Sequence, residues 1–300
     1  MGQPHEEFRQ GLDYLEAVTA LLQRSRLSHP TEGSFEAAEI QWWWSRRRPT
    51  DELPQLFWFD DEGRPEAAAI MTTWGDAVGL DPLVLPGSDP AWLTTVMTRG
   101  LAHATDHGHH AIELEVVSTN RHLLDLLAAE GFAFAEDGLV EHWMAAEDRA
   151  PISPLHDEYR LSTRRETPDV VYHYDKRGGP DVEARLQQTS LYDPDLDLFI
   201  RRHDGEHAAH CLFWYDPVTE TGVVEPLRTE DDHQRRGLAR HLLTVGLDRL
   251  AAAGAKRLKI CSEVDNPAAR RLYEGIGFEP VTQTVVYARS DSNADRGTAD

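Results

Sequence analysis

The chain has only two cysteines among 300 residues, Cys211 and Cys261, and no Cys-x-x-Cys pair. A disulfide framework needs more thiols, so it is excluded. Both cysteines lie in apolar runs. We therefore expect two buried thiols in a reducing compartment rather than a cysteine that relays an acyl group.

Positive charge and long apolar runs are also scarce. The sequence has 30 basic and 52 acidic side chains, a net charge of −22. Such a surface repels nucleic acid and anionic membranes and favours cationic ligands. No apolar stretch reaches the roughly 18 residues of a membrane helix, and residues 1–11 are polar. We therefore expect a cytoplasmic monomer or homodimer with no nucleic-acid or membrane partner.

A linker separates two halves with similar patterns. Residues 145–158 are charged, contain Pro151 and Pro154, and show no sustained apolar period. We predict one domain over 1–148, a second over 156–290, and a disordered tail over 291–300. When Gly108 is aligned with Gly254, the halves also match without a gap at Asn120 and Asn266, Leu126 and Leu272, and Gly131-Phe132 and Gly277-Phe278.

The apolar periodicity predicts an α/β protein whose halves share one order of elements. In each half, three strands precede a long helix, and a strand, a short helix and a last strand follow. In the second half we predict strands at 197–204, 207–215, 221–229, 256–264 and 282–289, and helices at 237–254 and 266–277. The first half has two further helices at its start, at 12–25 and 34–47.

The segment Asp231–Leu243, DDHQRRGLARHLL, places basic residues and a glycine at the start of a helix with an apolar stripe. A helix N-terminus presents unpaired N–H groups and about half a positive charge, which together bind anions. Gly237 lets the backbone approach a ligand closely, and Arg235 and Arg236 add positive charge. Neither the Gly-x-x-x-x-Gly-Lys loop nor the Gly-x-Gly-x-x-Gly loop occurs in the sequence.

The pattern Gln234-x-x-Gly237-x-Ala239 resembles the pyrophosphate loop of the GNAT superfamily, the GCN5-related N-acetyltransferases. The elements that follow, with Tyr273 seven residues after Asn266, are similar to that superfamily over residues 159–289. The resemblance implies the mixed-sheet α+β GNAT fold and acetyl-CoA as acetyl donor, with no metal. It assigns coenzyme binding to Leu227, Arg228, Thr229, Gln234, Arg235, Arg236, Gly237, Leu238, Ala239, Arg240, Asn266 and Tyr273.

The resemblance also implies catalytic roles. The acetyl carbonyl is expected to lie against backbone N–H groups near Arg228, where strand 221–229 parts from its neighbour. Pro226, which has no N–H, is a sign of that irregularity. Tyr273 is expected to protonate the departing thiolate, the alternative being a core aromatic residue. Glu225, in an apolar strand, is the candidate general base, the alternative being an edge carboxylate paired with Arg228.

The first half resembles the same fold without its chemistry. The position of the phosphate loop reads LPGSDPAW, Leu85–Trp92, in which two prolines remove amide donors and Asp89 adds negative charge. The position that matches Tyr273 is Leu127. No first strand is recognisable before the helix at 12–25. We therefore expect a tandem GNAT protein whose N-terminal domain is degenerate.

Two other clusters suggest different chemistry. His103, His107, His109 and His110 have a spacing that could bind a metal, but we interpret them as a solvated cluster at a helix C-terminus. The run Trp42–Arg48 suggests stacking on nucleic acid. Three consecutive tryptophans on a helix point in different directions, however, so packing between the two halves or over the acceptor cleft is the favoured interpretation.

Together these observations predict an acetyl-CoA-dependent N-acetyltransferase that acts by direct transfer on a primary amine of a small cationic molecule. Two alternatives stay open. One is a non-catalytic protein that senses acyl-CoA or acts as a scaffold, and the other is an acetyltransferase for protein N-termini or lysines. The sequence does not identify the acceptor, because acceptor loops vary on one fold.

Overall fold

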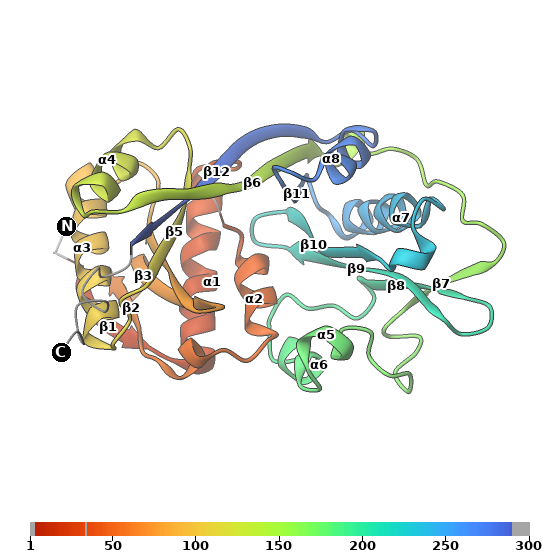
Figure 1. The fold of residues 1–300 in the computed structure, drawn as a ribbon, viewed down its shortest axis with the longest axis horizontal. Helices are drawn as coiled ribbons and strands as arrows, with labels where there is room; N and C mark the ends of the chain where they lie inside the picture. Colours follow the sequence, from red (N-terminus) through yellow and green to blue (C-terminus); the bar gives the residue numbers. More distant parts are fainter. Residues whose placement is uncertain (1–3, 34, 290–300) are drawn as a thin grey trace, which may run out of the picture. The chain divides into compact units, whose positions relative to one another are not determined.

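A computed structural model describes residues 4–33 and 35–289. These residues form two compact units that alternate along the chain (Figure 1). Within the described part, the first unit comprises 4–33, 48–138 and 283–289, and the second comprises 35–47 and 139–282. The units therefore differ from two contiguous segments divided near residue 150, and the predicted tail at 291–300 lies outside the described residues.

The first unit has a sheet in the order β1-β2-β3-β4-β5-β12, antiparallel except between β4 and β5. Its strands are β1 (His5–Arg9), β2 (Gln55–Phe59), β3 (Pro65–Trp74), β4 (Ala77–Val84), β5 (Ile112–Val117) and part of β12 (Glu279–Arg289). Its helices are α1 (Gly11–Ser28), the short 3₁₀ helix η1 (Pro49–Glu52), α3 (Pro90–Asp106) and α4 (Arg121–Ala129).

Strand β1 corrects the sequence analysis, which found no strand before α1. Residues His5–Arg9 pair antiparallel with β2, from His5 opposite Phe59 to Arg9 opposite Gln55. The strand lies at the edge of the sheet and most of its side chains are at least partly exposed. An exposed edge strand buries few side chains and therefore does not require alternating apolar residues. For this reason the sequence HEEFR does not predict a strand.

The second unit has a sheet in the order β6-β11-β10-β9-β8-β7, in which only β10 and β11 pair parallel. Its strands are β7 (Tyr159–Thr163), β8 (Asp197–Arg202), β9 (His207–Asp216), β10 (Thr221–Thr229), β11 (Arg257–Glu263) and part of β6 (Ala133–Ala145). Its helices are α2 (Ala37–Trp44), η2 (Ala146–Asp148), α5 (Asp175–Gly178), α6 (Val182–Leu186), η3 (Asp231–His233), α7 (Leu238–Ala253) and α8 (Pro267–Glu274).

The last strand of each sequence half belongs to the sheet of the other unit. Residues Leu139–Ala145 of β6 pair antiparallel with β11, and Thr284–Arg289 of β12 pair antiparallel with β5. The sequence predicted a closing strand near 282–289 but not its partner, because apolar alternation identifies a strand and not its neighbour.

The core of the second unit lies between α7 and one face of β8–β10 (Figure 1). Leu242, Leu243, Leu247 and Leu250 of α7 are fully buried against this face, as predicted from their spacing. Gly246 is essential to the fit, because a Cβ atom there would lie 2.0–2.3 Å from ring atoms of Phe213. Helices α5 and α6 lie on the other side of this sheet (Figure 1), and α2 contacts α6 and strands β9 and β10.

The sequence repeat corresponds to a structural repeat. The side chain of Asn120 accepts a hydrogen bond from the Leu123 amide at the start of α4, and Asn266 does the same for Ala269 at the start of α8. Gly108 and Gly254 both have positive φ after the long helix of their half. Each half therefore begins its short helix and ends its long helix in the same way.

Helix α2, which carries the Trp run, packs within the second unit. The indole N–H of Trp44 donates to Gln188 at 3.1 Å, and Trp42 lies 5.2 Å from the ring of Tyr174. The prediction of a solvated histidine cluster was wrong for one member. His103 is buried and its Nε2 is 2.7 Å from the carbonyl of Pro54.

Candidate active site

The predicted phosphate loop forms an open helix N-terminus. Gly237 precedes α7 with φ of +80°, a conformation that L side chains rarely adopt, and a Cβ atom there would meet nothing within 4 Å. No side chain caps α7, and its first turn contains no acidic residue. Gln234, Arg235 and Arg236 are exposed. The N–H groups of this turn therefore lack a side-chain acceptor, as an anion site requires.

The equivalent turn of the first unit already holds a carboxylate. Gly87 has φ of +79°, close to that of Gly237. In contrast to the α7 turn, the Asp89 side chain accepts a hydrogen bond of 2.9 Å from the Ala91 amide, and Pro90 has no amide proton to offer. Asp89 thus places a negative charge where a bound phosphate would lie, which agrees with a degenerate first half.

Strands β10 and β11 separate next to Pro226. Their parallel ladder runs from Thr221 opposite Arg257 to Val224 opposite Ile260 and ends there. On the other side of β10, pairing with β9 shifts register between Val224 and Leu227, and the Glu225–Pro226 peptide is cis. The buried indole of Trp214 donates to the Glu225 carbonyl at 2.8 Å. The backbone of Leu227–Thr229 is therefore free of a β11 partner, as the sequence analysis expected.

Tyr273 lies on α8 and is only 6% exposed. Its ring packs against His142 and Phe278 at centroid distances of 5.7 Å and 6.5 Å, in the same core cluster as Leu227 and Leu238. Burial, together with the nearby Cys211 and Cys261, raises the pKa of Tyr273 above its usual range. Its hydroxyl therefore keeps its proton at neutral pH, as a general acid must before it acts.

Glu225 is half-buried and lies beside Cys261. Burial raises the pKa of the Cys261 thiol, and Glu225 is among the carboxylates that raise it further, although Lys259 opposes them. Cys261 thus stays protonated, which argues against a cysteine acyl relay. The sequence analysis considered Arg228 as an ion-pair partner of Glu225. The guanidinium of Arg228 lies 3.6 Å from Glu230 and 3.8 Å from Asp231.

A buried lysine next to this region was not predicted. Lys259 of β11 is fully buried, with its Nζ 3.1 Å from Glu39, 3.2 Å from Glu141 and 3.8 Å from Glu36. Burial alone would lower the pKa of Lys259, but Glu39 and Glu141 hold it well above its usual range. Burial raises the pKa of Glu141 to about 7, against the effect of Lys259. No sequence pattern indicates the cluster, because α2 and β11 are about 220 residues apart.

A second unpredicted group surrounds a cavity of about 790 Å³, lined among others by His173, His207 and Glu230. The ring of His173 is stacked on that of His207 with centroids 5.4 Å apart, and its Nε2 lies 3.2 Å from the buried Asp197. Tyr172 and Tyr192 donate to the same carboxylate at 2.7 Å and 2.9 Å. Burial, with His173 and His207 nearby, lowers the pKa of His210 to about 2.

The loop, the separated strands and the capped α8 occur in one segment that matches a known family. The sequence profile described as the acetyltransferase (GNAT) family matches residues 155–278. Residues 155–278 are therefore similar to a GNAT-family acetyltransferase domain. All the predicted site residues lie within the matched segment.

The curated relatives that match this chain are acetyltransferases. A mycothiol acetyltransferase of Corynebacterium aurimucosum is 31% identical over 178 residues, which cover 56% of this chain and 57% of that protein. A mycothiol acetyltransferase of Beutenbergia cavernae is 37% identical over 108 residues, 36% of each chain. The matched parts thus span little more than half of the length of these relatives at most.

Solved structures extend the likeness to both units. A tandem GNAT protein from the clavulanic acid biosynthesis pathway aligns with a TM-score of 0.68 over 99% of this chain and 100% of that one, at 15% identity. A GCN5-related N-acetyltransferase from Sphaerobacter thermophilus aligns with a TM-score of 0.61 over 95% of both chains, at 17% identity. The tandem GNAT fold is thereby confirmed. Among the described residues, none of the helices has the length and apolarity needed to cross a membrane.

Proposed function

We propose that the protein is an acetyl-CoA-dependent N-acetyltransferase that acts on a primary amine of a small cationic molecule by direct transfer. The observation that carries the proposal is the uncapped N-terminus of α7 behind Gly237, next to the point where β10 leaves β11. A pyrophosphate accepts hydrogen bonds from the first-turn amides. The pantetheine arm then lies along Leu227–Thr229, where the edge of β10 has no strand partner on the β11 side.

The transfer step uses two side chains of the same region. The neutral amine attacks the carbonyl carbon of the thioester, and backbone N–H groups of Leu227–Thr229 stabilise the oxyanion. The carbon–sulfur bond breaks, and the Tyr273 hydroxyl protonates the departing thiolate of coenzyme A. Glu225 accepts the proton that the amine loses, through a water molecule.

A cationic acceptor is supported by charge. The chain has a net charge of −22, and the buried cluster beside Cys261 sets three carboxyl groups, from Glu36, Glu39 and Glu141, against one lysine. Glu225 adds a further carboxylate near Cys261. An ammonium group is attracted to such a surplus of negative charge before it is deprotonated for attack.

The similarity to mycothiol acetyltransferases favours a second candidate for the acceptor. This second candidate is the acceptor of the mycothiol acetyltransferases, in place of an unrelated amine metabolite. It is supported by identities of 31% and 37% to two such proteins. Both candidates share the donor, the GNAT domain and the proposed roles of Tyr273 and Glu225.

The test is an assay of free thiol released from acetyl-CoA over a panel of small amines, peptides with free N-termini, and the acceptor of mycothiol acetyltransferases. We expect turnover with at least one small amine and no turnover with the peptides. Coenzyme binding without turnover on any acceptor would show a sensor or scaffold protein. Turnover confined to peptides would show that the acceptor class is wrong.

A further inference from the structure

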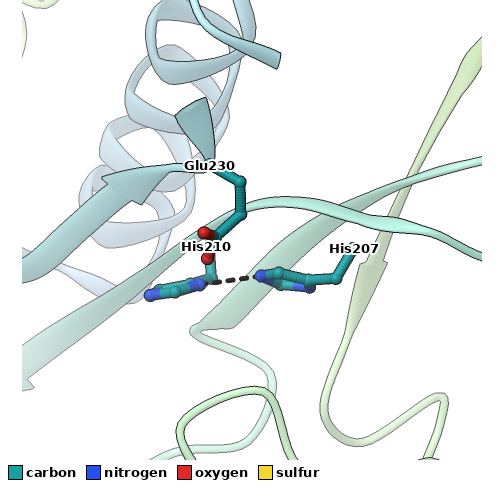
Figure 2. Close-up of side chains that lie close together, drawn as sticks. All are labelled: His207, His210 and Glu230. Carbon is teal, nitrogen blue, oxygen red and sulfur yellow. Dashed lines mark hydrogen bonds between the residues drawn. The ribbon is translucent and has the colours of Figure 1, made fainter. Parts of the chain in front are cut away.

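Three metal-ligand side chains converge at the beginning of β9 and the end of β10. One ligand atom from each of His207, His210 and Glu230 lies within 4.8 Å of the other two. Figure 2 shows the two imidazole rings edge to edge, with the carboxylate of Glu230 above His210. His207 Nε2 and His210 Nδ1 are 2.8 Å apart, so they share one proton in a hydrogen bond.

A β-bulge brings the two histidines to the same place. Residues three apart on a regular strand point to opposite faces. Here Ile200 of β8 is opposite Ala209, but Arg201 is opposite His207, so Ala208 is an additional residue in β9. Such a bulge redirects the side chains that precede it. The carbonyl of Ala208 in turn accepts a hydrogen bond of 2.9 Å from the Glu230 amide, which holds Glu230 at the bulge.

The donor set has the chemistry of a transition-metal site. Two imidazole nitrogens and one carboxylate oxygen suit zinc and its neighbours, whereas calcium and magnesium prefer oxygen ligands throughout. His210 is only 3% exposed, and a histidine binds a metal as the neutral imidazole. Bond lengths of about 2.1 Å place tetrahedral ligand atoms roughly 3.4 Å apart. The 2.8 Å separation of the two nitrogens needs to increase by less than an ångström to reach this value.

The surrounding charges also favour a cation. The lining of the cavity includes four acidic residues and two arginines, a difference of −2 when the histidines are left out of the count; they are Glu206, Glu230, Asp231, Asp232, Arg177 and Arg201. Arg177 lies 3.3 Å from Glu230 and Arg228 lies 3.6 Å from it, so both compete with a metal. Their side chains are 49% and 37% exposed, and ion pairs of such groups are weak and exchange readily with solvent.

We propose that His207, His210 and Glu230 bind one divalent transition-metal ion of the zinc class. Three protein ligands leave a fourth position for water or a ligand, as in zinc sites that are not purely structural. His207 and Glu230 line the cavity, so this position opens into it. The sequence analysis expected no metal, and on a strand without the bulge His207 and His210 would point to opposite faces. This site shares no residue with the proposed coenzyme site.

The test is calorimetric titration of chelator-treated full-length protein, without a histidine tag, with zinc sulfate. The variants are His207→Ala and the more conservative Glu230→Gln, and the control is His156→Ala, which removes an exposed histidine of the same unit. We expect one zinc ion per chain, an affinity at least about 10- to 100-fold lower in the two ligand variants, and no change in the control.

A second measurement guards against variants that fail to fold. Co²⁺ bound to the wild-type protein should show the strong visible absorption of a four-coordinate site with nitrogen ligands, and added zinc should remove it. The weak spectrum of hydrated Co²⁺ would overturn the proposal. Absence of stoichiometric zinc binding, or equal affinity in the wild type, His207→Ala and Glu230→Gln, would overturn it as well.

Discussion

Gly237 and Gly87 provide a matched pair of substitutions that tests which half binds the coenzyme. Both glycines precede the long helix of their half, with φ of +80° and +79°, and a Cβ atom at either position would meet no other atom within 4 Å. A side chain at either position therefore meets the same backbone penalty, about 1–2 kcal/mol for the left-handed conformation. Equal losses of stability are expected for Gly237→Gln and Gly87→Gln in urea unfolding.

Coenzyme binding should separate the two positions. At Gly237 a glutamate adds a negative charge beside the proposed pyrophosphate. At about 6 Å in water each phosphate charge repels it by roughly 0.7 kcal/mol, so two charges cost roughly 1.4 kcal/mol, a tenfold loss of affinity. Gly237→Glu should therefore bind acetyl-CoA at least about tenfold more weakly than Gly237→Gln, and the difference should shrink at high salt.

Isothermal titration of acetyl-CoA into the four variants measures this directly. Gly87→Glu should bind acetyl-CoA as the wild type does, because the Asp89 carboxylate already caps the N-terminus of α3. The assignment of the halves is refuted if Gly87→Glu weakens binding as much as Gly237→Glu does. It is also refuted if the glutamate and glutamine variants at Gly237 bind equally at low salt.

Four other changes test the site and the fold. Tyr273→Phe should lower kcat by roughly 10²- to 10⁴-fold with little effect on coenzyme affinity, and an unchanged kcat would return Tyr273 to a packing role. Glu225→Gln should lower kcat/KM by roughly 10²-fold and remove the acidic limb of the pH–rate profile; a wild-type profile would exclude it as the base. Gly246→Ala should destabilise by about 1–3 kcal/mol in urea, because overpacking against Phe213 outweighs the gain in helix propensity, and a stabilised variant would contradict the packing. Burial raises the pKa of Asp81 to about 8, so the folded wild type loses stability as the pH rises towards that value. Asp81→Asn should reduce this loss by up to about 1.4 kcal/mol per pH unit. Parallel stability curves of the two proteins from pH 5 to 8 would show that Asp81 ionises normally.

The local features of the candidate site could be predicted from the sequence. Gly237 at the start of α7, Asn266 at the cap of α8 and Pro226 at the irregularity of β10 all lie where the pattern placed them. Each depends on a rule that acts within a few residues: a left-handed turn, a side-chain cap, or a missing amide proton. The roles proposed for Tyr273 and Glu225 stay predictions, since they depend on a bound substrate.

Strand partners and side-chain clusters were decided only by the tertiary structure. The alternation in residues 282–289 predicts a strand equally well beside β5 or in the second sheet, and pairing with β5 depends on the whole first unit. Lys259 contacts Glu39, which lies on a helix about 220 residues away in the sequence, so no local pattern predicts the contact. The histidines of β9 point to opposite faces by the two-residue rule, and one additional residue, Ala208, brings them together. Sequence periodicity determines which residues form an element and which of its faces is apolar, whereas register and long-range contacts depend on the packing of the complete chain.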